Sequence, residues 1–250
     1  MDSTTTTTGL WDRLTGIQTA PDPWLVVVTG LVALGFVGVR PLWALSRNAV
    51  TIAHEGGHGL LALLTGRRLD GIRLHSDTSG VTVSRGRPSG PGMVLTAAAG
   101  YTAAPLLGLG GAALLSAHRI TLLLWAATAL LAVMLVMIRN AYGALTVILT
   151  GATFLLVSWL APAPVQAVFA YGVVWFLLLG GVRPVFELGA SRRSRRGRAG
   201  STYRSSDGAP DSDADQLGRL THVPAVVWLL VFHVVALCSL VGGGRWLLGL

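Results

Sequence analysis

The sequence predicts an all-α polytopic membrane protein with about six to seven transmembrane helices and a short cytoplasmic β-hairpin after the second helix. Two observations carry this prediction. Only 12% of the 250 residues are charged and the mean hydropathy is +0.63, whereas about a quarter of the residues of an ordinary soluble domain are charged. Several apolar runs also reach about 17 residues or more, which is enough for a helix to cross the hydrocarbon core.

The apolar runs define seven candidate spans, at residues 24–44, 48–65, 93–116, 120–138, 141–160, 165–183 and 223–241. They divide the chain into four parts: an N-terminal cytoplasmic segment (1–23), a transmembrane core (24–183), an Arg-rich cytoplasmic loop (184–222) and a C-terminal transmembrane helix (223–250). The polar stretch 66–92 interrupts the core. Its apolar residues alternate around "SDTSG", as Ile72 and Leu74 before it and Val81 and Val83 after it, which predicts a β-hairpin.

Positive charge predicts the orientation in the membrane. All 19 basic residues are Arg, and most of them lie in the stretches 66–92 and 189–222. Arg-rich loops remain on the cytoplasmic side. With seven spans, the N-terminus lies on that side as well and the C-terminus lies outside. The net charge of +8 is therefore interpreted as a topology signal with contacts to anionic lipids, and no nucleic-acid partner is expected.

Two features of composition bear on the source and the redox chemistry. The exclusive use of Arg, with abundant Ala, Gly, Leu and Val, indicates a GC-rich bacterial genome, so we expect the protein in the bacterial cytoplasmic (inner) membrane. The single Cys238 excludes a disulfide framework and a thiolate metal site.

The stretch "NAVTIAHEGGHGLLALLTG" carries an H-E-x-x-H motif inside the second candidate span. His54 and His58 are four residues apart and share one face of a helix, so both imidazoles can bind one zinc ion. Glu55 between them is the residue that takes a proton from water in such sites. One ionisable residue at mid-membrane costs about 2.5–3.5 kcal/mol. Three of them in five positions need a common compensation, and a metal ion provides it.

A multi-span chain with this helix and a following hairpin resembles the site-2 protease family of intramembrane zinc metallopeptidases, in particular the compact bacterial branch described as peptidase M50B-like. The stretches that carry the resemblance are "AHEGGHGLLALLTGRRLDGIRL", "GVTV", "AAAGYTAAPLLG", "IRNAYGALTVIL" and "SDADQLGRLTHVPAVVW". The resemblance implies a zinc cofactor held by His54, His58 and an Asp from a later span. It also implies a membrane-spanning substrate segment cut near the cytoplasmic side, such as a membrane-tethered regulator.

The third metal ligand departs from the family pattern. In "RNAYGAL", Asn140 is present but Tyr142 stands where the family places its Asp, and no Asp or Glu occurs within residues 93–186. Two candidates remain: Asn140, which can also be a hydrogen-bonding residue at a helix end, and Asp213 in "SDADQLGRL". The simpler interpretation of Asp213 is that it or Ser212 caps a short amphipathic helix.

Three functions follow from these residues. The first is an intramembrane zinc endopeptidase in which His54 and His58 bind the metal, Glu55 is the general base and then the general acid, and Asp213 or Asn140 completes the site. The second is a catalytically impaired relative that serves as a binding or assembly factor, which the missing acidic ligand in the later spans supports. A metal or proton transporter fits less well, because transporters distribute ionisable groups over several spans.

Overall fold

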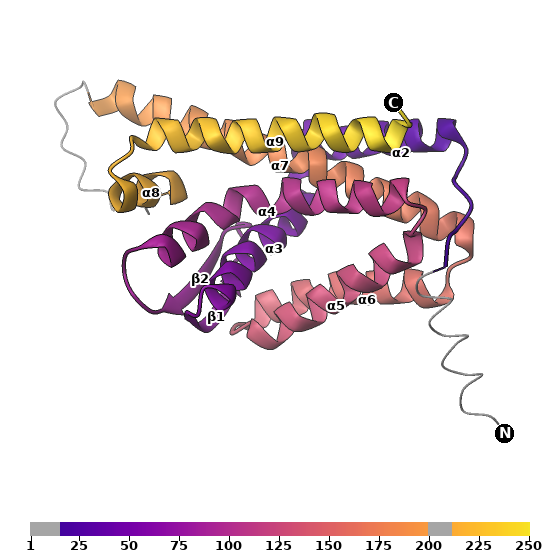
Figure 1. The fold of residues 1–250 in the computed structure, drawn as a ribbon, viewed down its shortest axis with the longest axis horizontal. Coiled ribbons are helices and arrows are strands. Elements are labelled where there is room, and N and C mark those ends of the chain that lie inside the picture. The colour runs from indigo at the N-terminus through magenta and orange to yellow at the C-terminus, as the bar shows by residue number, and fades with distance from the viewer. Residues whose placement is uncertain (1–15, 200–211) are drawn as a thin grey trace.

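The computed structural model describes residues 16–199 and 212–250. Its elements are α2 (Pro23–Gly38), α3 (Arg40–Leu64), β1 (Arg68–Leu74), β2 (Gly80–Arg85), α4 (Pro91–Ser116), α5 (Ile120–Met137), α6 (Ala141–Leu160), α7 (Ala163–Ala199), α8 (Asp213–Thr221) and α9 (Ala225–Leu248) (Figure 1). Within the described residues, five helices are long and apolar enough to cross a membrane, and α2 and α3 form one bent pair that raises the number to six. The mostly helical membrane fold with a hairpin is therefore confirmed.

The first two candidate spans correspond to this bent pair. Helix α2 ends at Gly38, α3 begins at Arg40, and their axes differ by 100°. The break lies several residues before the expected one, because Pro41 has no N–H with which to continue the α2 hydrogen bonds. The carbonyl of Val37 accepts a hydrogen bond from the guanidinium of Arg183 on α7 instead.

The start of the described chain and the hairpin lie at opposite ends of the molecule. The backbone N–H of Gln18 donates to the carbonyl of His118 over 3.0 Å, and the N–H of Thr121 donates to the Gln18 side chain over 2.8 Å. These partners lie at the turn between α4 and α5, and the hairpin lies at the other end of α4. The expectation that the N-terminus lies on the hairpin side depends on seven crossings and stays a prediction.

Helix α4 lies at the centre of the bundle, where small residues allow close contacts with α3 and α7. A Cβ added to Gly57 of α3 would lie 2.6 Å from the Cβ of Ala103, and one added to Gly108 would lie 2.9 Å from Leu178 of α7. Small residues at such crossings let membrane helices approach closely. The helix that carries the H-E-x-x-H motif is therefore held directly against α4.

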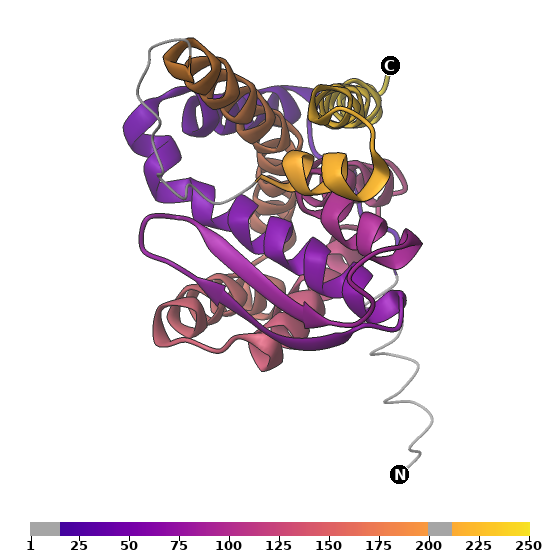
Figure 2. The same ribbon diagram turned by 90° about the vertical axis from the view of Figure 1, so that its left-hand side faces the viewer.

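The hairpin packs on α3 and on the turn between α5 and α6 (Figure 2). Strands β1 and β2 pair antiparallel, as the alternation predicts, and Ile72 and Leu74 are almost completely buried. The N–H of Arg139 donates to the carbonyl of Ile72 over 2.9 Å. The outer edge of β1 is thus covered, and β2 has no second strand partner among the described residues.

The segment 184–222, expected to be a loop, is mostly helical where it is described. Helix α7 continues to Ala199, and α8 occupies Asp213–Thr221. Ala and Arg are good helix formers, so the polar stretch after the α7 span extends the helix. The remaining part of the predicted loop, residues 200–211, and most of the N-terminal segment, residues 1–15, lie outside the described residues.

Candidate metal centre

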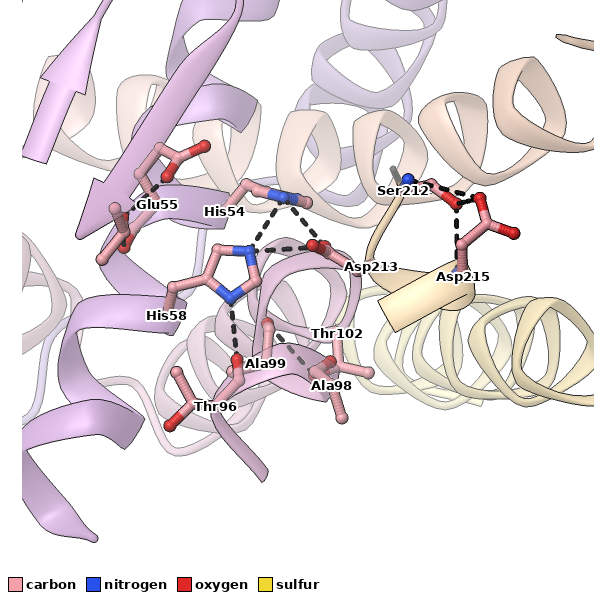
Figure 3. Close-up of polar contacts among 11 residues, drawn as sticks. His54, Glu55, His58, Thr96, Ala98, Ala99, Thr102, Ser212, Asp213 and Asp215 are labelled. Carbon is pink, nitrogen blue, oxygen red and sulfur yellow. Dashed lines mark hydrogen bonds and ion pairs between the residues drawn. The ribbon is translucent and has the colours of Figure 1, made fainter. Parts of the chain in front are cut away.

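Three side chains from two distant parts of the chain converge at one point (Figure 3). Nε2 of His54 and Nε2 of His58 lie 3.2 Å apart. Oδ2 of Asp213 lies 3.2 Å from the first nitrogen and 3.3 Å from the second. The three atoms form a nearly equilateral triangle, and among the described residues this is the group of His and acidic side chains that can hold a metal ion.

Helix α3 presents both imidazoles to α4 through a close backbone approach. His54 and His58 lie one turn apart on the face that meets α4. A Cβ added to Gly100 of α4 would lie 2.4 Å from Nε2 of His58 and 2.6 Å from Nε2 of His54. Gly100 therefore provides the space in which the two rings meet.

The His58 ring is oriented by a backbone carbonyl. Its Nδ1 lies 2.7 Å from the carbonyl oxygen of Thr96, which makes Nδ1 the protonated nitrogen and the donor. A neutral His58 then directs the lone pair of Nε2 at His54 and Asp213. This arrangement, in which the outer nitrogen is held by a carbonyl, is typical of metal-ligating histidines.

Helix α8 delivers Asp213 from outside the spans. Ser212 is the N-cap, and with Asp215 it forms a capping box: the Asp215 N–H donates to the Ser212 hydroxyl over 3.3 Å, and the Ser212 N–H donates to the Asp215 carboxylate. The capping role considered for Asp213 is thus filled by its neighbours. Ala214 and Leu217 are fully buried against α4, α7 and α9, which turns Asp213 toward the two imidazoles.

These residues fit a tetrahedral cation. Ligand atoms about 2.0–2.1 Å from a tetrahedral zinc ion are about 3.3 Å from one another, which matches the triangle. Oδ2 of Asp213 is buried and has no hydrogen-bond partner among the described residues. Lone pairs from His58 and Asp213 facing each other at 3.3 Å repel, unless a proton or a cation lies between them.

The carboxyl groups at the start of α8 are both stabilised as anions. Burial raises the pKa of Asp213, but the imidazoles of His54 and His58 outweigh it and hold that pKa well below its usual range. Burial also acts to raise the pKa of Asp215. The Ser212 hydroxyl and the Arg192 guanidinium outweigh this effect, so the pKa of Asp215 is lowered. Both groups are therefore carboxylates at neutral pH.

Glu55 lies beside the hairpin. Its side chain is buried, and its Oε2 accepts a hydrogen bond from the Thr82 hydroxyl of β2 over 2.7 Å. A Cβ added to Gly80 at the start of β2 would lie 2.5 Å from Cγ of Glu55. The hairpin therefore fixes the carboxylate next to the His pair, on the α3 turn that carries His54.

Asn140, the other candidate ligand, is not brought to the triangle. Its Nδ2 donates to the carbonyl of Leu74 over 2.7 Å, and its Oδ1 accepts from the Leu74 N–H over 3.2 Å. The side-chain amide thus imitates a neighbouring strand and fastens β1 to the start of α6. The Tyr142 hydroxyl accepts from Asn48, so the position expected for the family's Asp carries an interhelical hydrogen bond.

The sequence alone did not point to several residues that shape the site. The Thr82 hydroxyl donates to Glu55, the carbonyl of Thr96 orients His58, and Arg192 contacts the start of α8. A backbone carbonyl leaves no trace in the sequence. Thr82 does have a signal in the sequence, because it alternates with Val81 and Val83 and therefore lies on the other face of β2 from these two valines.

The described fold and site define a multi-span membrane protein with a His–His–Asp group that can hold a metal ion. The family model described as "Peptidase M50B-like" matches residues 27–243, and the chain belongs to this family, a branch of the site-2 proteases. No curated protein and no solved structure matches the chain. Family membership confirms the resemblance seen in the motif stretches and suggests a metallopeptidase.

Proposed function

We propose that the protein is an intramembrane zinc endopeptidase that cleaves a membrane-spanning segment. The observation that carries the proposal is the meeting of Asp213 with His54 and His58 in a triangle of 3.2–3.3 Å. Three protein ligands of this kind leave one of four positions open, as catalytic zinc sites do. When bound, zinc supplies a Lewis acid that polarises the scissile carbonyl and lowers the pKa of water.

The residues around the triangle supply the remaining chemistry. Glu55 accepts a proton from the attacking water and then returns it to the departing amine. The Thr82 hydroxyl and the close approach of Gly80 restrict the carboxylate to one position. Buried against β2, the carboxylate needs no large solvent rearrangement when the proton moves.

The substrate approaches from the side of the hairpin. The stretch 66–92, the C-terminal end of α7, the turn with Arg139 and α8 all lie at this end of the molecule. We infer from the charge that this end faces the bacterial cytoplasm. The second edge of β2 can add an unwound substrate segment as a further strand. The Arg residues at the end of α7 are suited to anionic lipids.

The experiment that tests the proposal separates metal binding from cleavage. Purified wild-type protein is expected to hold about one zinc ion per chain and to cut one of a panel of single-span segments. Glu55→Gln retains the zinc and loses cleavage by about 100-fold or more. Asp70→Asn is the matched control, because it removes a carboxylate from an exposed hairpin ion pair with Arg85, and we expect wild-type activity from it.

Two results would contradict the proposal in different ways. Wild-type protein that holds no zinc would refute the proposed metal site. Zinc bound without cleavage of any segment in the panel would favour the catalytically impaired relative, because the metal would then serve binding or assembly. A Glu55→Gln variant that cleaves at the wild-type rate would show that Glu55 is not the general base.

A further inference from the structure

The third ligand belongs to a helix that stands apart from the membrane spans. Helix α8 has nine residues, and residues 200–211 separate it from α7. An isolated helix of this length is not stable in water, so its position depends on contacts with the rest of the molecule. Because Asp213 is its first residue, any displacement of its N-terminal turn moves the carboxylate away from the imidazoles.

The buried side of α8 sets its distance from the bundle. Ala214 and Leu217 are fully buried, in one apolar cluster with Val185 of α7 and Phe232 of α9. Apolar contacts are not directional, so this packing alone permits rotation and sliding of the N-terminal turn. The direction in which Asp213 points needs a further restraint.

A charged contact supplies this restraint. Nη1 of Arg192 on α7 donates to Oδ1 of Asp215, and it lies 3.4 Å from Oγ of Ser212. The same guanidinium thus contacts the N-cap residue and the third helical residue, which flank Asp213 on either side. Arg192 and Asp215 have side chains that are 27% and 28% exposed, so solvent screens the pair only in part.

We propose that Arg192 is a positioning residue for the third metal ligand: it fastens the capping box of α8 to α7 and so keeps Asp213 on the His54–His58 pair. The proposal rests on the proposed function only in that a metal ion binds this triangle. Arg192 itself is no ligand and does not touch the reacting groups. Its loss leaves all three ligands in the chain and lowers the fraction of molecules in which they are assembled.

The chain offers a matched control one residue away. Arg193 is exposed, and its guanidinium lies beside Gly189 on its own helix. Arg192→Met and Arg193→Met remove the same charge from neighbouring positions of α7 and differ in the contact with α8. Arg192→Lys keeps a charge that can pair with Asp215, but it cannot donate in two directions from a planar group.

The first measurement is the affinity of the full-length protein in detergent for Co²⁺, followed by its d–d absorption and by competition with a chelator. We expect Arg192→Met to bind Co²⁺ about 10-fold more weakly than the wild type. This is the lower end of the loss of metal affinity seen when a residue that orients a metal ligand is replaced. Arg193→Met keeps the wild-type affinity and Arg192→Lys recovers most of it. Saturating Co²⁺ restores the wild-type spectrum to Arg192→Met, whereas Asp213→Asn keeps an altered spectrum.

The second measurement is hydrogen exchange of residues 213–221 in the metal-free protein. Arg192→Met is expected to exchange faster there, with α3 and α4 unchanged. Wild-type affinity and exchange in Arg192→Met would overturn the proposal. If Arg192→Met exchanges faster throughout the protein, the Arg192→Lys variant decides. Wild-type exchange of residues 213–221 in Arg192→Lys supports the contact, and faster exchange throughout Arg192→Lys refutes it. Wild-type protein that binds no Co²⁺ would refute the metal site. Hydrogen exchange of residues 213–221 would then still test whether Arg192 holds α8.

Discussion

The chemistry of the site depends on three ligand atoms, and contacts within the protein set the distances between them. His54 and His58 are separated by one helical turn, and the carbonyl of Thr96 fixes the second ring. Asp213 is held at the start of a capped helix, so its backbone is also fixed. A metal ion that enters this triangle therefore needs little rearrangement of the protein, and preorganisation of this kind favours tight binding.

Gly100 offers the most direct test at this scale. A Cβ at this position would overlap both imidazole nitrogens, at 2.4 Å and 2.6 Å, and the rings cannot retreat without leaving Thr96 and Asp213. We expect Gly100→Ala to weaken zinc binding by at least about 10-fold, the effect of disturbed ligand orientation. The measurement is zinc content after dialysis against a weak chelator.

Gly110 is the control for this substitution, because it lies on the same helix and a Cβ there meets no atom within 4 Å. Gly110→Ala is expected to keep its zinc and to gain up to about 1 kcal/mol of helix stability. Zinc retained equally by both variants would show that the rings do not occupy the space described here.

The two imidazoles and the base could be predicted from the sequence because a five-residue pattern on one helix fixes their geometry. The third ligand could not, because 155 residues separate His58 from Asp213 (213 − 58) and no local pattern relates them. The Asp213 carboxylate was one of two candidates. Its neighbours Ser212 and Asp215 form the cap of α8. Only the packing of Ala214 and Leu217 in the folded protein shows that the start of α8 points toward the two imidazoles.

At the scale of the elements, the bend between α2 and α3 brings the motif helix to α4. The sequence predicted two spans because the apolar runs 24–44 and 48–65 are each long enough for one. The bend is stabilised by Arg183, which donates to the carbonyl of Val37, lies 4.9 Å from the Trp43 ring centroid and pairs with Glu187. A contact between residues 146 positions apart cannot be inferred from local hydropathy.

Arg183→Met is expected to lower the free energy of unfolding by about 2–3 kcal/mol. The substitution removes a charged hydrogen bond to a backbone carbonyl, worth about 1.5–3 kcal/mol, and a cation–π contact. The measurement is unfolding of the purified protein in a mixed-micelle denaturant titration followed by circular dichroism. The comparison is Arg193→Met, whose side chain is exposed; equal unfolding curves for the two variants would mean that Arg183 does not stabilise the bend.

At the scale of the whole molecule, the bent pair determines which ends lie together. Gln18 lies beside the turn between α4 and α5, and the hairpin, the Arg139 turn and α8 lie at the other end of the described molecule. The metal triangle lies toward this second end. Under the proposed function, water and substrate are expected to reach the site from this end, which the Arg residues predict to be cytoplasmic.

This arrangement predicts the labelling of single cysteines in a Cys238→Ala background. Asp77→Cys in the hairpin turn and Ser116→Cys at the end of α4 are both exposed. A membrane-impermeant maleimide is expected to label Asp77→Cys only in inverted vesicles and Ser116→Cys only in right-side-out vesicles. Labelling of both from one side would contradict the arrangement of the spans.

The position of Asp213 also has a consequence for how the protein is made. Ribosomes deliver the chain from its N-terminus, so α3 and its two imidazoles reach the membrane long before the helix that completes the triangle. A nascent or prematurely terminated chain that lacks residue 213 has two ligands and no third. Under the proposed function, the chain therefore gains its full set of metal ligands only after α8 has been synthesised and has docked on the bundle.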